Sequence, residues 1–97
     1  MKSERVLPDL WEVIDDRFRN PSPLSYTSSL FQDSKGIDKP LEKVGEEAVE
    51  FILAAKGESR ERIIAEAADL QFHLFVAMRA AGITFDELLT ELSARKK

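Results

Sequence analysis

The chain has 97 residues, 33% of them charged, and a formal net charge of −4 at pH 7. This length predicts one domain, and the negative charge argues against non-specific nucleic-acid binding. The lack of cysteine excludes a disulfide scaffold, thiol chemistry and cysteine-based zinc sites. The segment MKSERVLPDL has no apolar signal core, and no stretch is long and apolar enough for a membrane span. We therefore expect a cytoplasmic protein that binds neither nucleic acid nor a membrane.

Apolar periodicity and capping residues predict five helical segments and no strand, which makes the expected fold class all-α. Thr84 and Glu87 have the spacing of a capping box at the start of the last segment. The expected segments are Pro8 to about Asn20, Ser25 to about Asp33, Lys39 to Lys56, a fourth from an N-cap at Ser59 to Gly82, and a fifth to about Lys96.

The fourth segment carries acids on an otherwise apolar helix. Between Ile63 and Met78 the only residues that are not apolar are Glu66, Asp69, Gln71 and His73. A helix that is apolar nearly all round is buried, and buried carboxylates are costly unless they are paired or bind a metal. The run contains no lysine or arginine, so we expect the partner of Glu66 and Asp69 to come from another element.

The third segment supplies a second pair of acids. Glu47 and Glu50 are three residues apart and share one helix face, as Glu66 and Asp69 do. A short connection near Gly57 makes the two helices antiparallel neighbours, so the four carboxylates can face one another. A divalent cation would relieve their repulsion, and ligands that are all oxygen favour Mg²⁺, Mn²⁺ or Ca²⁺ over Zn²⁺.

Two other interpretations of these acids remain open from the residues alone. Charged residues such as Glu46 and Glu50 are often no more than a solvated helix face. The more buried pair could form salt bridges instead, and the candidate cations for these are Arg5, Arg17 and Lys43. Ion-pair networks of this kind also occur away from functional sites.

Four stretches of the chain resemble a known family: LWEVIDDR, SYTSSLF, KGIDKPLEKVGEEAVEFILAAK and EAADLQFHLFV. The spacing E-x-x-E followed by E-x-x-D is similar to that of the all-α nucleoside triphosphate pyrophosphatase (MazG-like) superfamily. Together the stretches resemble the phosphoribosyl-ATP pyrophosphatase family of histidine biosynthesis, from about Leu10 to Leu92. Departures from the family pattern fall at Pro40, Glu42 and Gln71, and none of them alters the four acids.

The resemblance implies Mg²⁺-dependent hydrolysis of phosphoribosyl-ATP to phosphoribosyl-AMP and pyrophosphate. It implies that Glu47, Glu50, Glu66 and Asp69 hold one or two Mg²⁺ or Mn²⁺ ions while water attacks the α-phosphate, with Glu46 as a candidate general base. His73 is either a core residue or a group that hydrogen-bonds a ligating carboxylate. Candidate substrate contacts, given by the resemblance, are Lys43, Lys39, Lys56, Tyr26, Ser25, Arg17 and Lys35.

The face of the fourth segment around Phe72, Phe75 and Val76 lies away from the face around Ile63 and Leu70. Four short helices do not readily cover both faces, so we expect a homodimer that completes an antiparallel helical bundle, with the active sites near the interface. Two rival functions remain. One is a MazG-like house-cleaning pyrophosphatase acting on other nucleoside triphosphates, and the other is a non-enzymatic helical dimerisation module.

Overall fold

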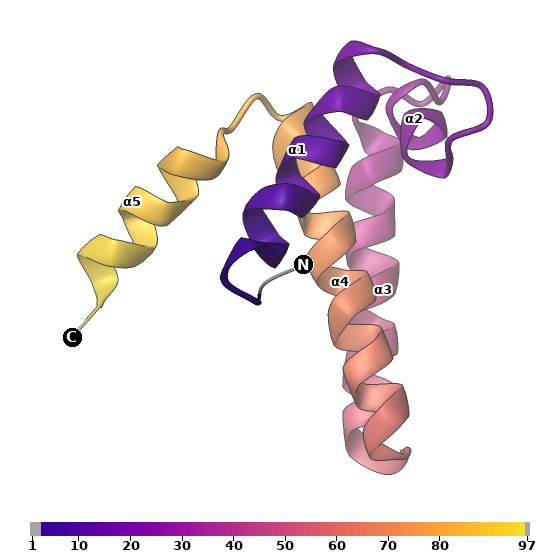
Figure 1. Cartoon of the computed structure of the whole chain (residues 1–97). Helices are drawn as coiled ribbons and strands as arrows, with labels where there is room; N and C mark the ends of the chain where they lie inside the picture. The colour runs from indigo at the N-terminus through magenta and orange to yellow at the C-terminus, as the bar shows by residue number, and fades with distance from the viewer. Residues whose placement is uncertain (1–2, 97) are drawn as a thin grey trace.

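The structure, a computed structural model, describes residues 3–96. Within that range it contains one short 3₁₀ helix and five α-helices (Figure 1). The elements are η1 (Ser3–Arg5), α1 (Val6–Arg19), α2 (Tyr26–Phe31), α3 (Asp38–Gly57), α4 (Arg60–Ala80) and α5 (Phe85–Arg95). The all-α class and the five predicted helices are confirmed, and the predicted helix ends lie within about two residues of the observed ones.

The expected capping residues mark both ends of α4 and the start of α5. The Ser59 hydroxyl accepts a hydrogen bond from the Arg62 amide at 3.3 Å, and Thr84 and Glu87 form the complete capping box. At the end of α4, Gly82 has φ +81°, and the Ile83 amide donates to the Met78 carbonyl at 3.0 Å. This is a Schellman motif, which turns the chain sharply away from α4.

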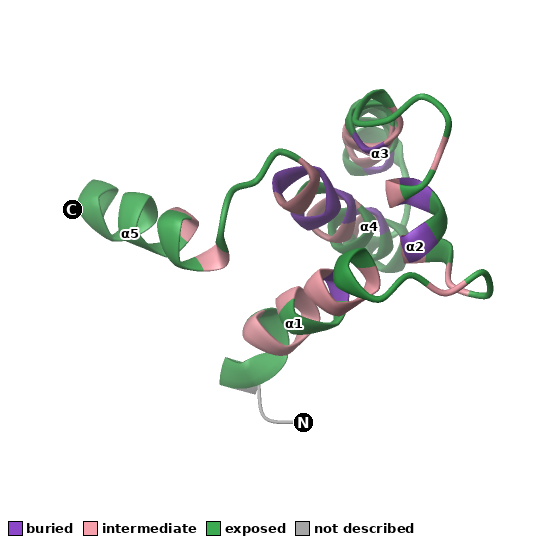
Figure 2. Ribbon diagram, turned by 90° about the horizontal axis from the view of Figure 1, so that it is seen from above, coloured by how far each residue is buried: buried purple, intermediate pink, exposed green. Residues whose placement is uncertain are grey.

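The antiparallel pair of α3 and α4 is the longest feature of the molecule (Figure 1). Only Glu58 and Ser59 separate the two helices, so they must fold back on each other, as predicted from the short connection. Helix α1 packs across the C-terminal half of α4, and α2 lies at the same end of the pair (Figure 2). Among the described residues, only those of α3 therefore lie beside the N-terminal half of α4.

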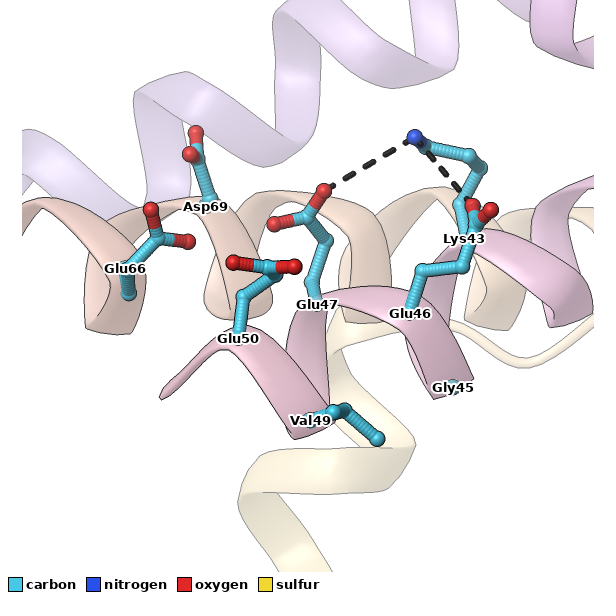
Figure 3. Close-up of a pocket in the computed structure, with 8 residues that line it drawn as sticks. All are labelled: Lys43, Gly45, Glu46, Glu47, Val49, Glu50, Glu66 and Asp69. Carbon is cyan, nitrogen blue, oxygen red and sulfur yellow. Dashed lines mark ion pairs between the residues drawn. The ribbon is translucent and has the colours of Figure 1, made fainter. Parts of the chain in front are cut away.

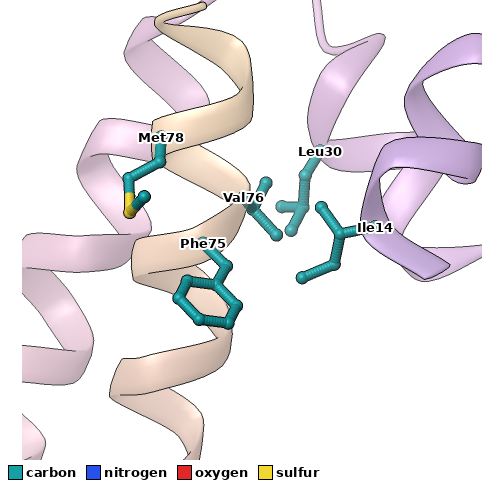
Figure 4. Packing of buried hydrophobic residues seen from close by; sticks show 5 residues of the cluster. All are labelled: Ile14, Leu30, Phe75, Val76 and Met78. Carbon is teal, nitrogen blue, oxygen red and sulfur yellow. The ribbon is translucent and has the colours of Figure 1, made fainter. Parts of the chain in front are cut away.

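The core lies where α1, α2 and α4 meet, as the buried positions in Figure 2 show. It consists of Ile14, Leu30, Phe75, Val76 and Met78 (Figure 4). Trp11 closes one side, with its ring centroid 5.4 Å from that of Phe75 in an edge-to-face arrangement. This core fixes the C-terminal half of α4 and leaves the acidic half beside α3.

Helix α4 is not buried all round between Ile63 and Met78 in the single chain, whose short helices we expected not to cover both of its faces. Ile64 is 59% exposed and Leu74 is 41% exposed, while continuous burial begins only at Phe75. The physical reason is that α1 covers only the second half of α4. The apolar first half therefore presents an uncovered surface.

Helix α5 also departs from the expected bundle, because it projects away from the other helices (Figure 1). Only its beginning joins the core, where Phe85 lies 5.7 Å from Phe75 between ring centroids. Leu89 and Leu92, further along, are exposed. Within residues 3–96, no helix is both long enough and apolar enough to cross a membrane.

Candidate metal and substrate site

Three of the four predicted metal ligands come together between α3 and α4. One carboxylate oxygen each from Glu47, Glu66 and Asp69 lies within 4.8 Å of the others. Glu47 comes from α3, and Glu66 and Asp69 come from successive turns of α4 (Figure 3). Because the helices are antiparallel neighbours, residues that are far apart in the sequence lie at the same level along the two helix axes.

These side chains line a cavity of about 640 Å³ at the surface of the α3–α4 pair. Glu50 lines the cavity as well, although its carboxylate is not one of the three that converge. Glu46 also lies at the cavity and is exposed. The structure therefore brings all four predicted ligands and the candidate base to one cavity, with Glu50 and Glu46 at its open side.

Glu66 is the most enclosed acid of the group, with 5% of its surface exposed. Its Oε1 pairs with the Arg62 guanidinium, whereas Oε2 is buried and has no hydrogen-bond partner. Oε2 is the sole buried side-chain oxygen or nitrogen in the described part of the chain that lacks one. A buried carboxylate oxygen without a partner is costly, so it indicates a ligand that the protein alone does not supply.

The expectation that α4 brings no partner for its own acids is wrong, because Arg62 lies in the first turn of α4. The i,i+4 spacing of Arg62 and Glu66 is the signal in the sequence that identifies this ion pair. The charge of Glu66 and its hydrogen bond raise the pKa of Arg62 above its ordinary value. None of the three cations considered from the sequence pairs with Glu66. Arg5 pairs with Asp9, Arg17 with Asp16, and Lys43 with Glu46 and Glu47.

Asp69 is exposed, contrary to the expectation that both acids of α4 are buried. Since α1 does not reach the first half of α4, solvent has access to Asp69 from the cavity. A ligand set with one buried and two more accessible carboxylates leaves room for water and substrate on the open side.

Lys43 is the cation at the edge of the cavity on α3. Its Nζ lies 3.3 Å from Glu46 Oε2 and 3.7 Å from Glu47 Oε1 (Figure 3). Partial burial works to lower the pKa of Lys43, but the hydrogen bond with Glu46 and the neighbouring negative charges outweigh it and raise this pKa. Lys43 is therefore protonated at neutral pH, in reach of an anion that enters the cavity.

His73 is buried one turn beyond Asp69 and makes two hydrogen bonds. Its Nδ1 lies 2.8 Å from the Asp69 backbone carbonyl, and its Nε2 lies 3.0 Å from the Tyr26 hydroxyl. The carbonyl only accepts, so Nδ1 carries a proton, and in the neutral ring Nε2 then accepts from the Tyr26 hydroxyl. Of the two interpretations from the sequence, the buried and hydrogen-bonded ring fits the core residue, because its contact with Asp69 goes through the backbone carbonyl and not through the carboxylate.

The remaining candidate substrate contacts are spread over other parts of the surface. Arg17 and Ser25 line a second cavity of about 520 Å³, and Ser25 also caps α2 by accepting from the Ser28 amide. Lys35 is held by Glu42 at 3.0 Å. Lys39 is half-buried in the first turn of α3, and Lys56 is exposed in the last turn of α3. None of these five lines the carboxylate cavity.

The donor set at the cavity fits a hard divalent cation. Its converging ligands are all carboxylate oxygens, which suit Mg²⁺, Mn²⁺ or Ca²⁺. Two like charges about 5 Å apart repel by about 3 kcal/mol in surroundings of intermediate polarity, so the cluster favours a bound cation. The unpartnered Oε2 of Glu66 supplies a ligand atom with no competing hydrogen bond.

An all-α chain with carboxylates converging from two antiparallel helices is the arrangement expected for the all-α pyrophosphatase class that the sequence resembles. The family model described as phosphoribosyl-ATP pyrophosphohydrolase matches residues 7–96. The chain belongs to this family of enzymes, which are hydrolases.

Similar proteins match the chain over nearly its full length. The phosphoribosyl-ATP pyrophosphatase of Methanoculleus marisnigri is 55% identical over 97 residues, which cover 100% of both chains. That of Methanosphaerula palustris is 50% identical and covers 100% of this chain and 98% of its own. That of Methanoregula boonei is 55% identical over 93 residues, 96% of this chain and 89% of its own. The family predicted from the four sequence stretches is confirmed.

Proposed function

We propose that this chain hydrolyses phosphoribosyl-ATP to phosphoribosyl-AMP and pyrophosphate, as a step of histidine biosynthesis. We further propose that Glu47, Glu50, Glu66 and Asp69 hold the Mg²⁺, or Mn²⁺, that the reaction needs. The observation that carries this proposal is the buried, unpartnered Oε2 of Glu66 within a group of three converging carboxylates. The family membership supplies the substrate.

The reaction adds water across a phosphoanhydride bond. An oxygen of water forms a bond to the α-phosphorus, the bond from that phosphorus to the bridging oxygen breaks, and pyrophosphate leaves with that oxygen. When bound, the divalent cation supplies charge neutralisation on the triphosphate and lowers the pKa of water. Glu46 is our candidate for the base that accepts the proton of water, because it lines the cavity and is exposed to solvent.

Lys43 is our first candidate for holding a substrate phosphate, since its ammonium lies at the edge of the carboxylate cavity. Tyr26 is our candidate for the sugar or base, because its exposed ring stacks with Phe72 and its hydroxyl is oriented by His73. We propose five further residues as more distant substrate contacts, which require a substrate that extends beyond the carboxylate cavity. They are Arg17, Ser25, Lys35, Lys39 and Lys56.

We also propose that the chain works as a homodimer with the active sites near the interface. The outer face of α3 exposes Val49, Ile52 and Leu53, which share one side of the helix at i, i+3 and i+4. Val49 lines the carboxylate cavity as well, so a second copy covering this face would lie next to that cavity. Exposed apolar surface of this kind, on α3 and on the first half of α4, is typical of an interface.

We propose a cytoplasmic location, because a substrate with several phosphate charges does not cross a lipid membrane unaided.

Turnover of a substrate panel tests the proposed function. Wild type in Mg²⁺ should release pyrophosphate from phosphoribosyl-ATP much faster than from ATP or other nucleoside triphosphates. Glu50→Gln and Asp69→Asn should lower kcat by at least about a hundredfold, with circular dichroism unchanged. Glu61→Gln, an exposed acid in the first turn of α4 outside the cavity, is the matched control and should keep full activity.

The same experiments also test the two rival functions, which are the house-cleaning pyrophosphatase and the non-enzymatic dimerisation module. Equal or faster turnover of ordinary nucleoside triphosphates would favour the house-cleaning reaction. Full activity in excess chelator, or in either variant, would refute the metal-dependent mechanism. A wild-type thermal stability that does not rise with Mg²⁺ would also argue against the metal-dependent mechanism, because a ligand that binds only the folded state stabilises it.

A further inference from the structure

We propose that Arg62 is a cation built into the chain that competes with the divalent metal for the carboxylate cluster. It stabilises the metal-free protein and, for the same reason, weakens its affinity for Mg²⁺. This inference rests on the proposed function, because it concerns the affinity of the same site.

The geometry of the Arg62–Glu66 pair carries the proposal. Arg62 lies in the first turn of α4, four residues before Glu66, so both side chains occupy one side of the helix. The guanidinium reaches Glu66 Oε1 through Nη2, while its Nε lies 3.5 Å from Glu58 Oε2. Within the described residues, Arg62 is the sole cation paired with Glu66.

The two partners differ sharply in burial, and this difference decides what the pair does. The side chain of Glu66 is 6% exposed, whereas that of Arg62 is 53% exposed. Solvent can screen the charge of Arg62 but not that of Glu66, so in the metal-free chain Glu66 depends on Arg62 for its compensating charge. Without Arg62, the buried carboxylate of Glu66 would face Glu47 and Asp69 with no paired cation among the described residues, since Lys43 pairs with Glu47 instead.

The same contact opposes a divalent cation. Oε2 of Glu66 is the free oxygen, and it belongs to the same carboxyl group whose Oε1 holds the guanidinium. A cation at Oε2 would therefore lie close to a guanidinium that stays charged at every physiological pH. Since like charges a few ångströms apart repel even in a polar medium, Arg62 must raise the free energy of the metal-bound state.

A purely structural role for Arg62 predicts the opposite effect on metal affinity. If its hydrogen bond mainly oriented the carboxylate of Glu66, removal of Arg62 would weaken Mg²⁺ binding, as loss of groups that support metal ligands usually does. The sign of the change in Mg²⁺ affinity therefore separates competition from orientation.

The test compares Mg²⁺ dissociation constants of full-length variants, measured by calorimetric titration, together with their thermal stability in chelator. Arg62→Gln removes the charge and should tighten Mg²⁺ binding by about tenfold. It should also lower Tm in the absence of metal. Arg62→Lys keeps a positive charge and should stay within about twofold of wild type in affinity.

Arg95→Gln is the matched control. Arg95 forms an i,i+4 pair with Glu91 on α5, with its Nε 2.7 Å from Glu91 Oε2, and both side chains are exposed. The substitution changes the net charge by the same amount and should leave the Mg²⁺ dissociation constant unchanged. Equal or weaker Mg²⁺ binding by Arg62→Gln would overturn the competition. Wild type that binds no Mg²⁺ would instead refute the proposed function, so the two failures are distinguishable.

Discussion

The hydroxyl of Tyr26 donates a hydrogen bond to Nε2 of His73 across a distance of 3.0 Å, although the two residues are 47 positions apart in the sequence. Tyr26 begins α2, and His73 lies on α4 one turn beyond Asp69, whose backbone carbonyl accepts from Nδ1 of the same ring. The imidazole therefore connects the exposed Tyr26 ring to the part of α4 that carries the acids. It also holds α2 against the α3–α4 pair.

We predict that Tyr26 and His73 are energetically coupled. Tyr26→Phe and His73→Asn each remove one partner of the hydrogen bond, and each should lower the free energy of unfolding by about 1 kcal/mol or more. The double variant should lose less than the sum, with a coupling of about 1 kcal/mol, because the second change has no bond left to break. Urea denaturation in chelator measures all four proteins. Strict additivity would contradict the coupling.

Lys43 offers a second prediction, which concerns the substrate. Lys43→Gln removes the ammonium at the cavity edge and should raise KM for phosphoribosyl-ATP by about tenfold, the effect of losing one charge-assisted contact to a phosphate. Binding of Mg²⁺ should be unchanged or tighter, since Lys43 also lies beside Glu47. Steady-state kinetics at saturating Mg²⁺ measures KM. An unchanged KM would remove Lys43 from the substrate contacts.

The outer face of α3 gives a prediction about assembly. Leu53→Asp places a charge on the exposed apolar face and should turn the expected homodimer into a monomer in light scattering coupled to gel filtration. Leu24→Asp is the matched control, because Leu24 is 95% exposed and belongs to the segment between α1 and α2 rather than to α3. Wild type that elutes as a monomer, or a Leu53→Asp variant that stays dimeric, would be incompatible with this interface.

Asp15 gives a prediction for the pH dependence of stability. Its Oδ1 lies 2.7 Å from Arg79 Nε on α4, and its Oδ2 lies 2.9 Å from Arg19 Nε. The hydrogen bond from Arg79 lowers the pKa of Asp15 below its ordinary value. Partial burial opposes this shift, and Arg19 adds to it. A carboxyl whose pKa is lower in the folded state stabilises the fold above its unfolded pKa. That stabilisation is lost as the pH falls through the folded pKa.

Asp15→Asn should therefore lower the free energy of unfolding at pH 7 by about 1 kcal/mol. It should also reduce the loss of stability that wild type shows as the pH falls below about 4. Denaturation curves at a series of pH values measure both effects. Asp86→Asn, at an exposed acid in the first turn of α5, is the control. A pH profile of Asp15→Asn that parallels wild type in the acid range would refute the role of this pair.

The local structure was predictable because it depends on neighbours in the sequence. Ser59, Gly82 and the pair of Thr84 and Glu87 mark helix ends through their own hydrogen bonds and dihedral angles, so the sequence places them within a residue or two. The i,i+3 spacing of Glu66 and Asp69 likewise puts them on one face, whatever else the chain does.

What the sequence by itself determined was an all-α chain, the positions of its helices and the i,i+3 spacing that puts each pair of acids on one face of α3 or α4. Only the tertiary structure decided which surfaces are covered. It left the first half of α4 open, turned α5 away from the bundle and connected His73 to Tyr26. The reason is that helix periodicity fixes which residues share a face, whereas burial depends on where elements distant in the sequence pack. That packing also leaves Oε2 of Glu66 enclosed and without a partner.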